Sequence, residues 1–230
     1  MRQDRTRQDR TCQDRRLALV TGAHRGPGLA IASALAQAGV QILLGCRSRE
    51  RGHAAAAARP EGAWMEPVHL DVTDDWSIAA LRELVRREYG RLDILVNAAE
   101  VALDARDDLL PRERFERSFA VNATGAAAVT EAMLPLLTRS EAPCVVNLLA
   151  APGGGAPAYL ASKAALEALT RAEAARLKGL GIKVNGIRPV SLPGPAGLRA
   201  TAELARRYAL LGPDGPSGTV AMAEPLALAG

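Results

Sequence analysis

Short apolar runs that alternate with amphipathic or alanine-rich stretches are the feature that most restricts the fold of this chain. The apolar runs suit strands that are buried on both faces of a parallel sheet, and the longer stretches between them suit helices that cover those faces. The sequence therefore predicts an α/β fold, with a doubly wound parallel sheet of about seven strands. We expect these strands at residues 17–21, 40–44, 65–70, 92–96, 144–149, 182–187 and 219–222.

Two helices have clear boundaries in the sequence. Thr73 is a good N-cap for a helix that Gly90 would end, and Asp74 and Asp75 suit its positive end. A second helix begins near Pro111 and continues through the apolar residues up to position 137. The Gly- and Pro-rich segment 188–197 follows a strand, where a doubly wound fold carries ligand-facing loops. We expect a compact loop there, from Pro189 to Leu211.

Length and composition indicate one domain with a short tail. The 230 residues, 48% of them hydrophobic, can bury one sizeable core, and no linker divides the chain. We therefore expect a single domain over residues 17–230. Residues 2–16 are three copies of an Arg-rich pentapeptide, which predicts a disordered tail at 1–16 or an artefact of start-codon choice. A functional basic arm is the alternative.

The charge balance argues against a nucleic-acid partner. Of the net charge of +4, the six Arg and three Asp of the repeat supply +3, and the rest of the chain, with 23 basic and 22 acidic groups, supplies +1. The sequence has no run of about 18 apolar residues for a membrane span and no signal peptide at its charged N-terminus. We expect a cytoplasmic protein. No metal site is predicted, because neither the cysteines nor the histidines have ligand spacing: Cys12, Cys46, Cys144, His24, His53 and His69.

A glycine-rich turn follows the first expected strand. The stretch TGAHRGPGLAIASALAQAG places Gly22, Gly26 and Gly28 between that strand and a helix. Small residues there let the backbone approach a pyrophosphate, whose charge lies at the positive helix N-terminus. A tight turn without a ligand is the alternative, but strand, turn and helix occur in the order that dinucleotide binding needs.

From this turn onward the chain resembles the short-chain dehydrogenase/reductase family, whose glycine pattern is TGxxxGxG. The resemblance spans about residues 17–222 and implies a Rossmann-type fold, a nicotinamide cofactor and oxidoreductase activity. Three stretches, CRSRERG, REYGRLDILVN and DGPSG, are most similar to the carbonyl-reductase branch. Further family marks are LDVTD with Asp71 and Val72, LDILVNAAE with Asn97, FAVNATG with Asn122, and YLASK with Tyr159 and Lys163.

The end of the second expected strand favours NADP(H) over NAD(H). A carboxylate there would bind the ribose hydroxyls of NAD, but this sequence reads Gly45, Cys46, Arg47. Arg47 and Arg25 together offer a cationic pocket for a 2′-phosphate. Two solvated surface arginines are the alternative. The family's pattern further implies four cofactor contacts: Asp71 at the adenine, Val72 beside it, Asn97 at the ribose through its backbone, and Pro189 after the sixth strand.

Tyr159 and Lys163 are the expected acid/base pair. Residues four apart share one face of a helix, and an ammonium beside a phenol lowers the phenol pKa from its ordinary value of about 10. The resemblance implies that Tyr159 protonates a carbonyl oxygen as hydride arrives from the nicotinamide. It also implies that Lys163 binds the nicotinamide ribose and that Asn122 supports a water relay.

A substrate hydrogen-bond donor is missing from this expected site. The family carries Ser in a pattern like VNxSSxxG, whereas VVNLLAAPG has Leu149 and Ala150 at the two Ser positions, and the segment before Tyr159 is shorter than usual. Losing one such donor lowers the rate by about 100- to 1000-fold. Other departures are Glu100 for the Gly of NNAG, Pro27 inside the glycine turn, and Val190 after Pro189.

Three functions are compatible with these departures. One is an NADPH-dependent ketone or quinone reductase whose substrate polarises its own carbonyl, helped by the Asn147 side chain or a backbone N–H. The second is a non-redox enzyme that uses Tyr159 and Lys163 in a cyclisation, dehydration or isomerisation. The third is a non-catalytic partner subunit. The strong preference for Arg over Lys is typical of GC-rich bacteria, where such altered members often serve specialised metabolism. We expect a homodimer or homotetramer that pairs the helices near Pro111 and Pro157.

Overall fold

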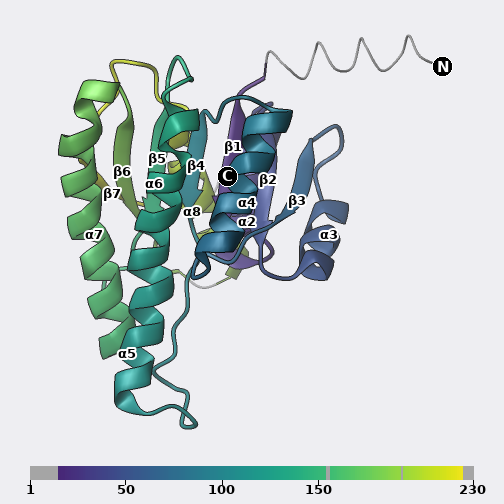
Figure 1. Ribbon diagram of the computed structural model, residues 1–230. Coiled ribbons are helices and arrows are strands. Elements are labelled where there is room, and N and C mark those ends of the chain that lie inside the picture. The colour runs from purple at the N-terminus through teal and green to yellow at the C-terminus, as the bar shows by residue number, and fades with distance from the viewer. Residues whose placement is uncertain (1–14, 154–155, 193, 225–230) are drawn as a thin grey trace, which may run out of the picture.

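A seven-stranded parallel sheet forms the centre of the molecule, in the order β3-β2-β1-β4-β5-β6-β7 (Figure 1). The computed structural model describes residues 15–153, 156–192 and 194–224. The strand order reverses between β1 and β4, which in doubly wound folds is where ligands bind. The strands are β1 (Leu17–Thr21), β2 (Gln41–Cys46), β3 (Met65–His69), β4 (Ile94–Asn97), β5 (Cys144–Leu148), β6 (Lys183–Arg188) and β7 (Val220–Met222).

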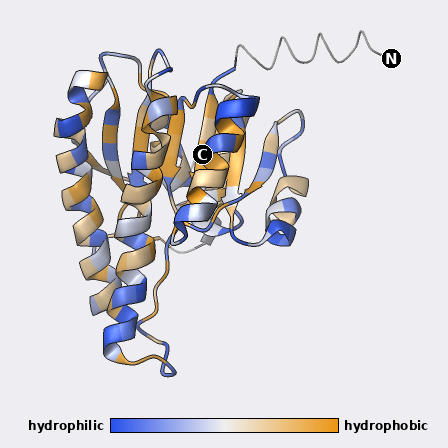
Figure 2. Ribbon diagram, in the orientation of Figure 1, coloured by the Kyte–Doolittle hydropathy of each residue, from blue (hydrophilic) through white to orange (hydrophobic). Residues whose placement is uncertain are grey.

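The fold and all seven strands are predicted correctly. β1 has the expected bounds, and the other strands overlap the expected ranges with ends that differ by one or two residues. The middle strands are apolar because they are covered on both sides: every residue of β1, β2, β4 and β5 is buried. Figure 2 shows this as an apolar centre with more polar helices around it.

Two helical layers cover the sheet. One apolar cluster joins the sheet to α2 (Gly26–Gln37), α3 (Arg49–Ala57) and α8 (Gly194–Ala209). The other joins it to α4 (Asp75–Glu88), α6 (Ala126–Leu137) and α7 (Pro157–Leu177). α5 (Pro111–Phe119) and the start of α7 extend beyond the carboxyl edge of the strands (Figure 1). Within this extension α5 packs against α7, and the start of α7 forms one side of the site described below.

The helix that begins at Pro111 is continuous to Leu137, as expected. A π-helical segment, η1 (Ala120–Gly125), joins α5 to α6, and π segments are often found at functional sites. By length and composition the whole stretch could span a membrane, but half of its most apolar window is buried inside the protein. Val129, Met133 and Leu136 lie in the core cluster that covers one face of the sheet.

Two local predictions are wrong. The N-cap of α4 is Asp74, whose Oδ1 accepts from the Trp76 N–H at 3.0 Å, because the hydroxyl of Thr73 instead donates to Asp71. The expected loop from Pro189 to Leu211 is mostly the helix α8, since the alanines after its Gly- and Pro-rich start favour helix. A short 3₁₀ turn, η2 (Lys178–Leu180), follows α7.

Parts of the expected tail and loops lie outside the described residues. These are residues 1–14, 154–155, 193 and 225–230. Arg16, at the end of the repeat, already contacts the domain, since its guanidinium donates to the Ala142 carbonyl at 2.9 Å. The Arg15 carbonyl likewise accepts from the Arg91 guanidinium at 3.0 Å, so the predicted tail is two residues too long, and for residues 1–14 it stays a prediction.

Candidate active site

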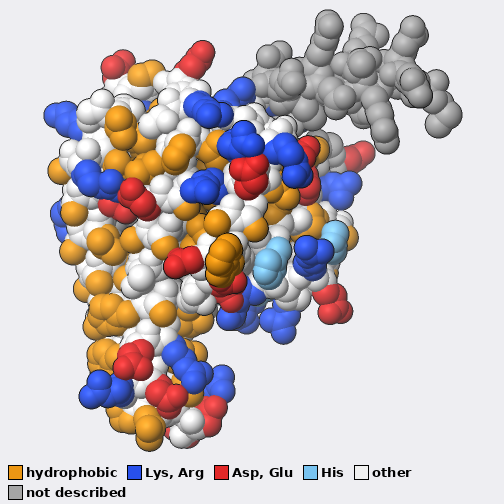
Figure 3. Space-filling model, in the orientation of Figure 1, with side chains coloured by type: hydrophobic (Ala, Val, Ile, Leu, Met, Phe, Trp, Pro, Cys, Tyr) orange, Lys and Arg blue, Asp and Glu red, His pale blue; other side chains and the backbone are white. Residues whose placement is uncertain are grey.

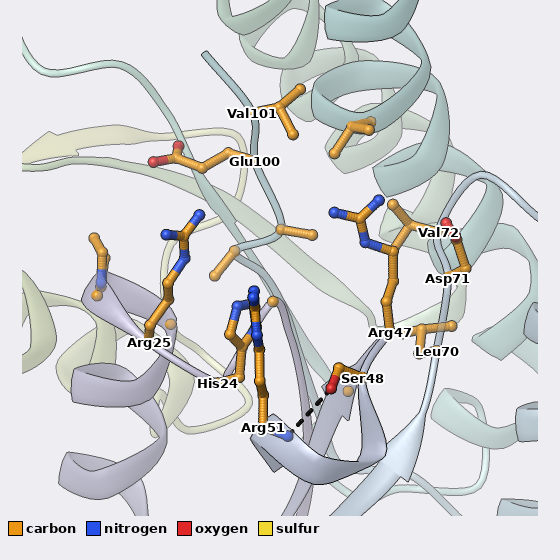
Figure 4. Close-up of a pocket in the computed structure, with 18 of the residues that line it drawn as sticks. His24, Arg25, Arg47, Ser48, Arg51, Leu70, Asp71, Val72, Glu100 and Val101 are labelled. Carbon is orange, nitrogen blue, oxygen red and sulfur yellow. Dashed lines mark hydrogen bonds between the residues drawn. The ribbon is translucent and has the colours of Figure 1, made fainter. Parts of the chain in front are cut away.

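A cleft of about 850 Å³ opens at the carboxyl edge of the sheet, beside the reversal in strand order. Its walls are the turn between β1 and α2, the end of β2 with the start of α3, the segment after β3, and the segment after β4 (Figure 4). Most of the sequence-predicted cofactor residues are brought together here, although they come from four separate parts of the chain.

The glycine turn has the geometry that the sequence predicts. Gly22 has a φ of +67°, and a Cβ there would lie 2.7 Å from the Ala99 Cα. A Cβ on Gly28 would lie 2.8 Å from the Gly22 carbonyl oxygen, so both positions need the absence of a side chain. Pro27 lies in the first turn of α2 and has no N–H, so this helix start offers one donor fewer to an anion.

Three arginines line the cleft, one from the turn after β1 and two from the segment after β2. Arg25 precedes α2, Arg47 follows β2 and Arg51 is in the first turn of α3, whose N-cap Ser48 accepts from the Arg51 N–H at 3.2 Å (Figure 4). Among the described residues, no carboxylate lies within ion-pairing distance of any of the three guanidinium groups. Arg51 was not predicted, although the run RSRERG contains the signal.

His24 lies among these arginines. Burial lowers the pKa of its imidazole, and the charges of Arg25, Arg51 and Arg47 lower it further. Its Nδ1 is buried without a hydrogen-bond partner among the described residues. The imidazole is therefore neutral at neutral pH, and it leaves the arginines as the charged groups of this end of the cleft.

Asp71 and Val72 line the cleft as predicted, after β3. The Asp71 Oδ1 accepts from the N–H and the hydroxyl of Thr73, at 2.9 and 2.7 Å. Burial opposes ionisation of Asp71, but these hydrogen bonds and the charge of Arg47 outweigh it, and its pKa is lowered. Asp71 therefore both orders the turn before α4 and presents a carboxylate to the cleft.

Asn97 and Pro189 have different surroundings. The Asn97 amide is buried and donates to Thr130 Oγ1 at 3.0 Å and to Asn147 Oδ1 at 2.8 Å, beneath the cleft. Only its backbone remains for a ligand, as the family's pattern implies. Pro189 directly follows β6, at the same edge of the sheet but two strands away from β4. Their contacts with a cofactor stay predictions.

The predicted catalytic pair lies at the start of α7, and Glu100 contacts both members. The Lys163 ammonium is 2.7 Å from Glu100 Oε2 and donates to the Leu148 carbonyl at 2.7 Å. The Tyr159 hydroxyl donates to the same Glu100 oxygen at 3.3 Å. The Lys163 side chain is 1% exposed and that of Glu100 is 32% exposed. One carboxylate thus faces both groups.

The predicted effect of Lys163 on Tyr159 is wrong in this structure. Burial raises the pKa of the Tyr159 hydroxyl, and the charge and hydrogen bond of Glu100 raise it further. The ammonium does not lower it, because Lys163 is paired with Glu100 and lies over the phenol ring, 5.8 Å from its centroid. Tyr159 therefore keeps its proton at neutral pH, and while Glu100 faces it the hydroxyl is a weaker acid than an ordinary phenol.

Asn122 connects the segment after β4 to the catalytic helix. In η1 its side chain accepts from the Val101 N–H at 2.8 Å and donates to the Val101 carbonyl at 2.9 Å. It also donates to Ser162 Oγ at 2.9 Å, and that hydroxyl donates to the Tyr159 carbonyl at 2.8 Å. Asn122 therefore holds the backbone beside Glu100 against α7. Its predicted role in a water relay is untested.

Asp104 caps the catalytic helix. Its two carboxylate oxygens accept from the N–H groups of Ala158 and Tyr159, at 2.9 and 3.1 Å. A carboxylate at this positive helix end is stabilising, and it replaces the side-chain cap that the N-cap residue Ala156 lacks. Sequence reasoning missed this contact, because Asp104 is 54 residues away from the helix that it caps.

The side chain at the missing Ser position is Ala150, and the nearby Ser191 hydroxyl donates to the Pro152 carbonyl at 2.7 Å. Ala150 follows β5 and is buried, and its carbonyl accepts from the Arg188 guanidinium at 3.2 Å. Arg188 is also paired with Glu167, one turn after Lys163 on α7. The suggestion that Asn147 helps is wrong, since its buried amide donates to Thr170 and its Oδ1 accepts from Asn97.

Several known proteins resemble this chain in sequence and fold. The family model for short chain dehydrogenases matches residues 16–197. A cyclopentanol dehydrogenase of Comamonas is 32% identical over 86% of this chain and 81% of its own length, and a rhamnolipid-biosynthesis 3-oxoacyl-[acyl-carrier-protein] reductase of Pseudomonas aeruginosa is 34% identical over 77% and 73%. A solved structure of the P. aeruginosa RhlG/NADP active-site complex superposes with a TM-score of 0.82 and 28% identity, covering 91% of this chain and 95% of that one.

Proposed function

Since the chain belongs to the short-chain dehydrogenase family of oxidoreductases, which use nicotinamide cofactors, we propose that it is an NADPH-dependent reductase of ketones or quinones, of an atypical kind. The observation that carries this proposal is the group of three guanidinium ions, on Arg25, Arg47 and Arg51, that line the cleft with no carboxylate of the described residues within ion-pairing distance.

A 2′-phosphate is the ligand that best fits these arginines. Guanidinium groups bind phosphate through paired, charge-assisted hydrogen bonds, whereas the diol of an NAD ribose needs a carboxylate that this end of β2 does not carry. The likeness to a structure solved with NADP supports the same preference. The glycine turn gives room for the pyrophosphate, although Pro27 removes one of its donors.

The catalytic end fits proton donation to a carbonyl. The nicotinamide, when bound, supplies a hydride to the carbonyl carbon. Tyr159, held as a neutral phenol, gives its proton to the carbonyl oxygen, and the product is an alcohol. Asp104 and Asn122 keep the start of α7 in place while Tyr159 exchanges its proton with solvent.

The substrate we propose carries its own hydrogen-bond donor beside the carbonyl, such as a hydroxyketone. The Ala150 side chain supplies no donor, and the buried Asn147 amide already donates to Thr170. Among the relatives, one is named for cyclopentanol and another, from Agrobacterium fabrum, for galactitol, so alcohol chemistry on small carbon frames is represented. The carbonyl-reductase branch, a place in bacterial specialised metabolism and a cytoplasmic location are parts of the same proposal.

We also propose a homo-oligomer. Leu110, Phe115 and Leu160 are large apolar side chains that stay exposed on α5 and α7, and apolar side chains gather over these helices in Figure 3. Apolar surface of this kind favours pairing between copies of the chain. Light scattering at micromolar concentration tests it, and a monomer mass contradicts it.

The proposed activity is tested by following product mass and nicotinamide absorbance in one assay. Purified protein and NADPH are incubated with cyclohexanone and, separately, with 2-hydroxycyclohexanone. The proposal predicts faster turnover of the hydroxyketone, with a two-hydrogen mass gain matched by loss of NADPH. Turnover at constant absorbance contradicts it, and supports the alternative, favoured by the donorless Ala150, of a non-redox enzyme that uses Tyr159 and Lys163.

A further inference from the structure

Glu100 takes up the hydrogen-bonding groups that the proposed reaction needs to be free. The Tyr159 hydroxyl has one proton, which it donates to Glu100 Oε2. The Lys163 ammonium has three N–H groups, of which one points to Glu100 and one to the Leu148 carbonyl. A carbonyl oxygen can receive the Tyr159 proton only after it replaces the Glu100 carboxylate.

We propose that Glu100 is an internal competitor for ligands of the catalytic end, so that the nicotinamide half of the cofactor and the substrate enter only as the Glu100 carboxylate leaves Tyr159 and Lys163. This inference rests on the proposed NADPH function. It assigns to Glu100 a direct effect on affinity, because a ligand that binds Tyr159 must replace its hydrogen bond to Glu100 Oε2, the same oxygen that is paired with Lys163. The adenosine end of the cleft carries no such competitor among the described residues.

The Glu100 side chain is the member of this group that can move. Lys163 is 1% exposed, whereas Glu100 is 32% exposed and lines the open cleft. Its backbone is held on both sides, because Ala98 and Ala99 donate to Thr21 Oγ1 at 3.0 and 2.9 Å and Val101 is bonded to Asn122. Release therefore needs only a rotation of the Glu100 side chain.

The ion pair opposes this release. A buried ammonium that loses its anionic partner is strongly destabilised unless another acceptor replaces it. Hydroxyl and carbonyl oxygens of a ligand are weaker acceptors for a cation than a carboxylate is. Ligand binding at the catalytic end is therefore weakened by the exchange, while binding at the three arginines is not.

A purely structural role is the competing explanation for Glu100. If the carboxylate only neutralises the buried Lys163, then its removal lowers the stability of the fold and affects the binding of all ligands alike. The two explanations differ in one quantity: the affinity for whole NADPH relative to the affinity for adenosine 2′,5′-bisphosphate, which occupies the adenosine end alone.

The test is calorimetric titration of the native protein, Glu100→Gln and Glu100→Gly with both nucleotides. Glu50→Gln is the matched control, since Glu50 is an exposed carboxylate in the first turn of α3, close to the arginines but on another element than Lys163. We expect the Kd of NADPH to fall at least tenfold in both Glu100 variants. The Kd of the bisphosphate should stay within about twofold in all variants, because this ligand does not reach Glu100. Partial misfolding, by contrast, would weaken the binding of both nucleotides together.

Two other outcomes refute the competition, and a third refutes the proposed 2′-phosphate site. An NADPH Kd that is unchanged or raised in both Glu100 variants overturns the competition, whatever the bisphosphate does. An equal gain for NADPH and the bisphosphate also overturns it, since the effect would then be one of net charge. Absence of bisphosphate binding in the native protein refutes the proposed 2′-phosphate site instead.

Discussion

The two ends of the cleft hold their cations in opposite ways. At the adenosine end, Arg25, Arg47 and Arg51 face the cleft with no carboxylate in ion-pairing distance among the described residues. At the catalytic end, Lys163 is 2.7 Å from Glu100 and almost completely buried. Three exposed guanidinium groups attract an anionic ligand at long range, whereas the paired ammonium presents almost no net charge to it.

This difference shows that the two ends of one cleft meet a charged ligand with different electrostatics. The arginines depend on the turn after β1 and on the start of α3, while the Glu100 contact depends on the segment after β4 and on α7. The two supports meet where the end of β1 contacts the segment after β4, since Ala98 and Ala99 donate to Thr21 Oγ1. The contrast also makes each end separately testable.

The largest expected effect is at the catalytic end. Tyr159→Phe should lower the rate of NADPH-dependent reduction by about 100- to 10,000-fold, because the phenol is the proton donor. The Kd of adenosine 2′,5′-bisphosphate should not change. Tyr208→Phe is the matched control, since Tyr208 lies on α8 and packs against the core cluster on the face of the sheet opposite α7. Steady-state kinetics followed by product mass measure the effect, and full activity in Tyr159→Phe would mean that the catalytic site lies elsewhere.

The next effect is at the adenosine end. Arg47→Asp should raise the Kd of NADPH by about 100-fold, since it replaces one or two charge-assisted hydrogen bonds, each of about 1.5–3 kcal/mol, by repulsion. The Kd of NADH should stay the same or fall. Arg112→Asp, on the exposed side of α5, is the control for net charge. Equal affinities of the native protein for NADPH and NADH would remove the proposed role of the arginines.

A smaller gain is expected when the missing donor is restored. Ala150→Ser should raise the rate on cyclohexanone by up to about 100-fold, the scale of one oxyanion donor, if the new hydroxyl faces the substrate. On 2-hydroxycyclohexanone the same change should matter little, because that substrate brings its own donor. Rates on the two ketones, compared within each protein, measure this. An equal gain on both would contradict the proposed substrate class.

The smallest effect concerns Glu173, a buried carboxylate on α7. Burial raises the pKa of Glu173 to about 7, with Glu131 adding to the rise and Arg176 opposing it. The folded protein thus holds a proton that the unfolded chain, with a carboxyl pKa near 4.5, has released. The free energy of unfolding should therefore fall as pH rises from about 4.5 to 7 and then level off.

Glu173→Gln removes this penalty. At pH 8 the variant should be more stable than the native protein by on the order of 2 kcal/mol, a Tm rise of roughly 4–8 °C, and at pH 5 the two should be nearly equal. Thermal unfolding at the two pH values measures it, with the exposed Glu88→Gln as control. A gain of the same size at pH 5 would show that Glu173 is ionised in the fold or acts through packing.

The sequence predicts the sheet well because the strands are local apolar runs with no competing interpretation. β1 and the helix from Pro111 follow from a few adjacent residues each. The N-cap of α4 was misplaced by one residue, since Thr73 and Asp74 are both good caps and only tertiary structure decides which side chain Asp71 engages. α8 was read as a loop because its first residues are Gly and Pro.

The site was predictable in its positions but not in its contacts. Tyr159, Lys163 and the glycine turn were found from spacing. Pairing of Glu100 with Lys163 joins side chains 63 positions apart, and no periodic pattern reports such a contact; the only signal was a large acid at an expected Gly. The direction of the Tyr159 pKa was missed for the same reason. Asn147 was misjudged because a strand buried on both faces does not reveal which face a side chain occupies.

The most direct test of this contrast is a pair of crystal structures of the native protein, one without nucleotide and one with NADPH. Without nucleotide, the account predicts Glu100 Oε2 within hydrogen-bond distance of Lys163 Nζ, near the 2.7 Å seen here. With NADPH it predicts a 2′-phosphate among the three arginines and a Glu100 carboxylate beyond ion-pairing distance of Lys163. An unchanged ion pair, with the nicotinamide half bound beside Tyr159, would contradict it.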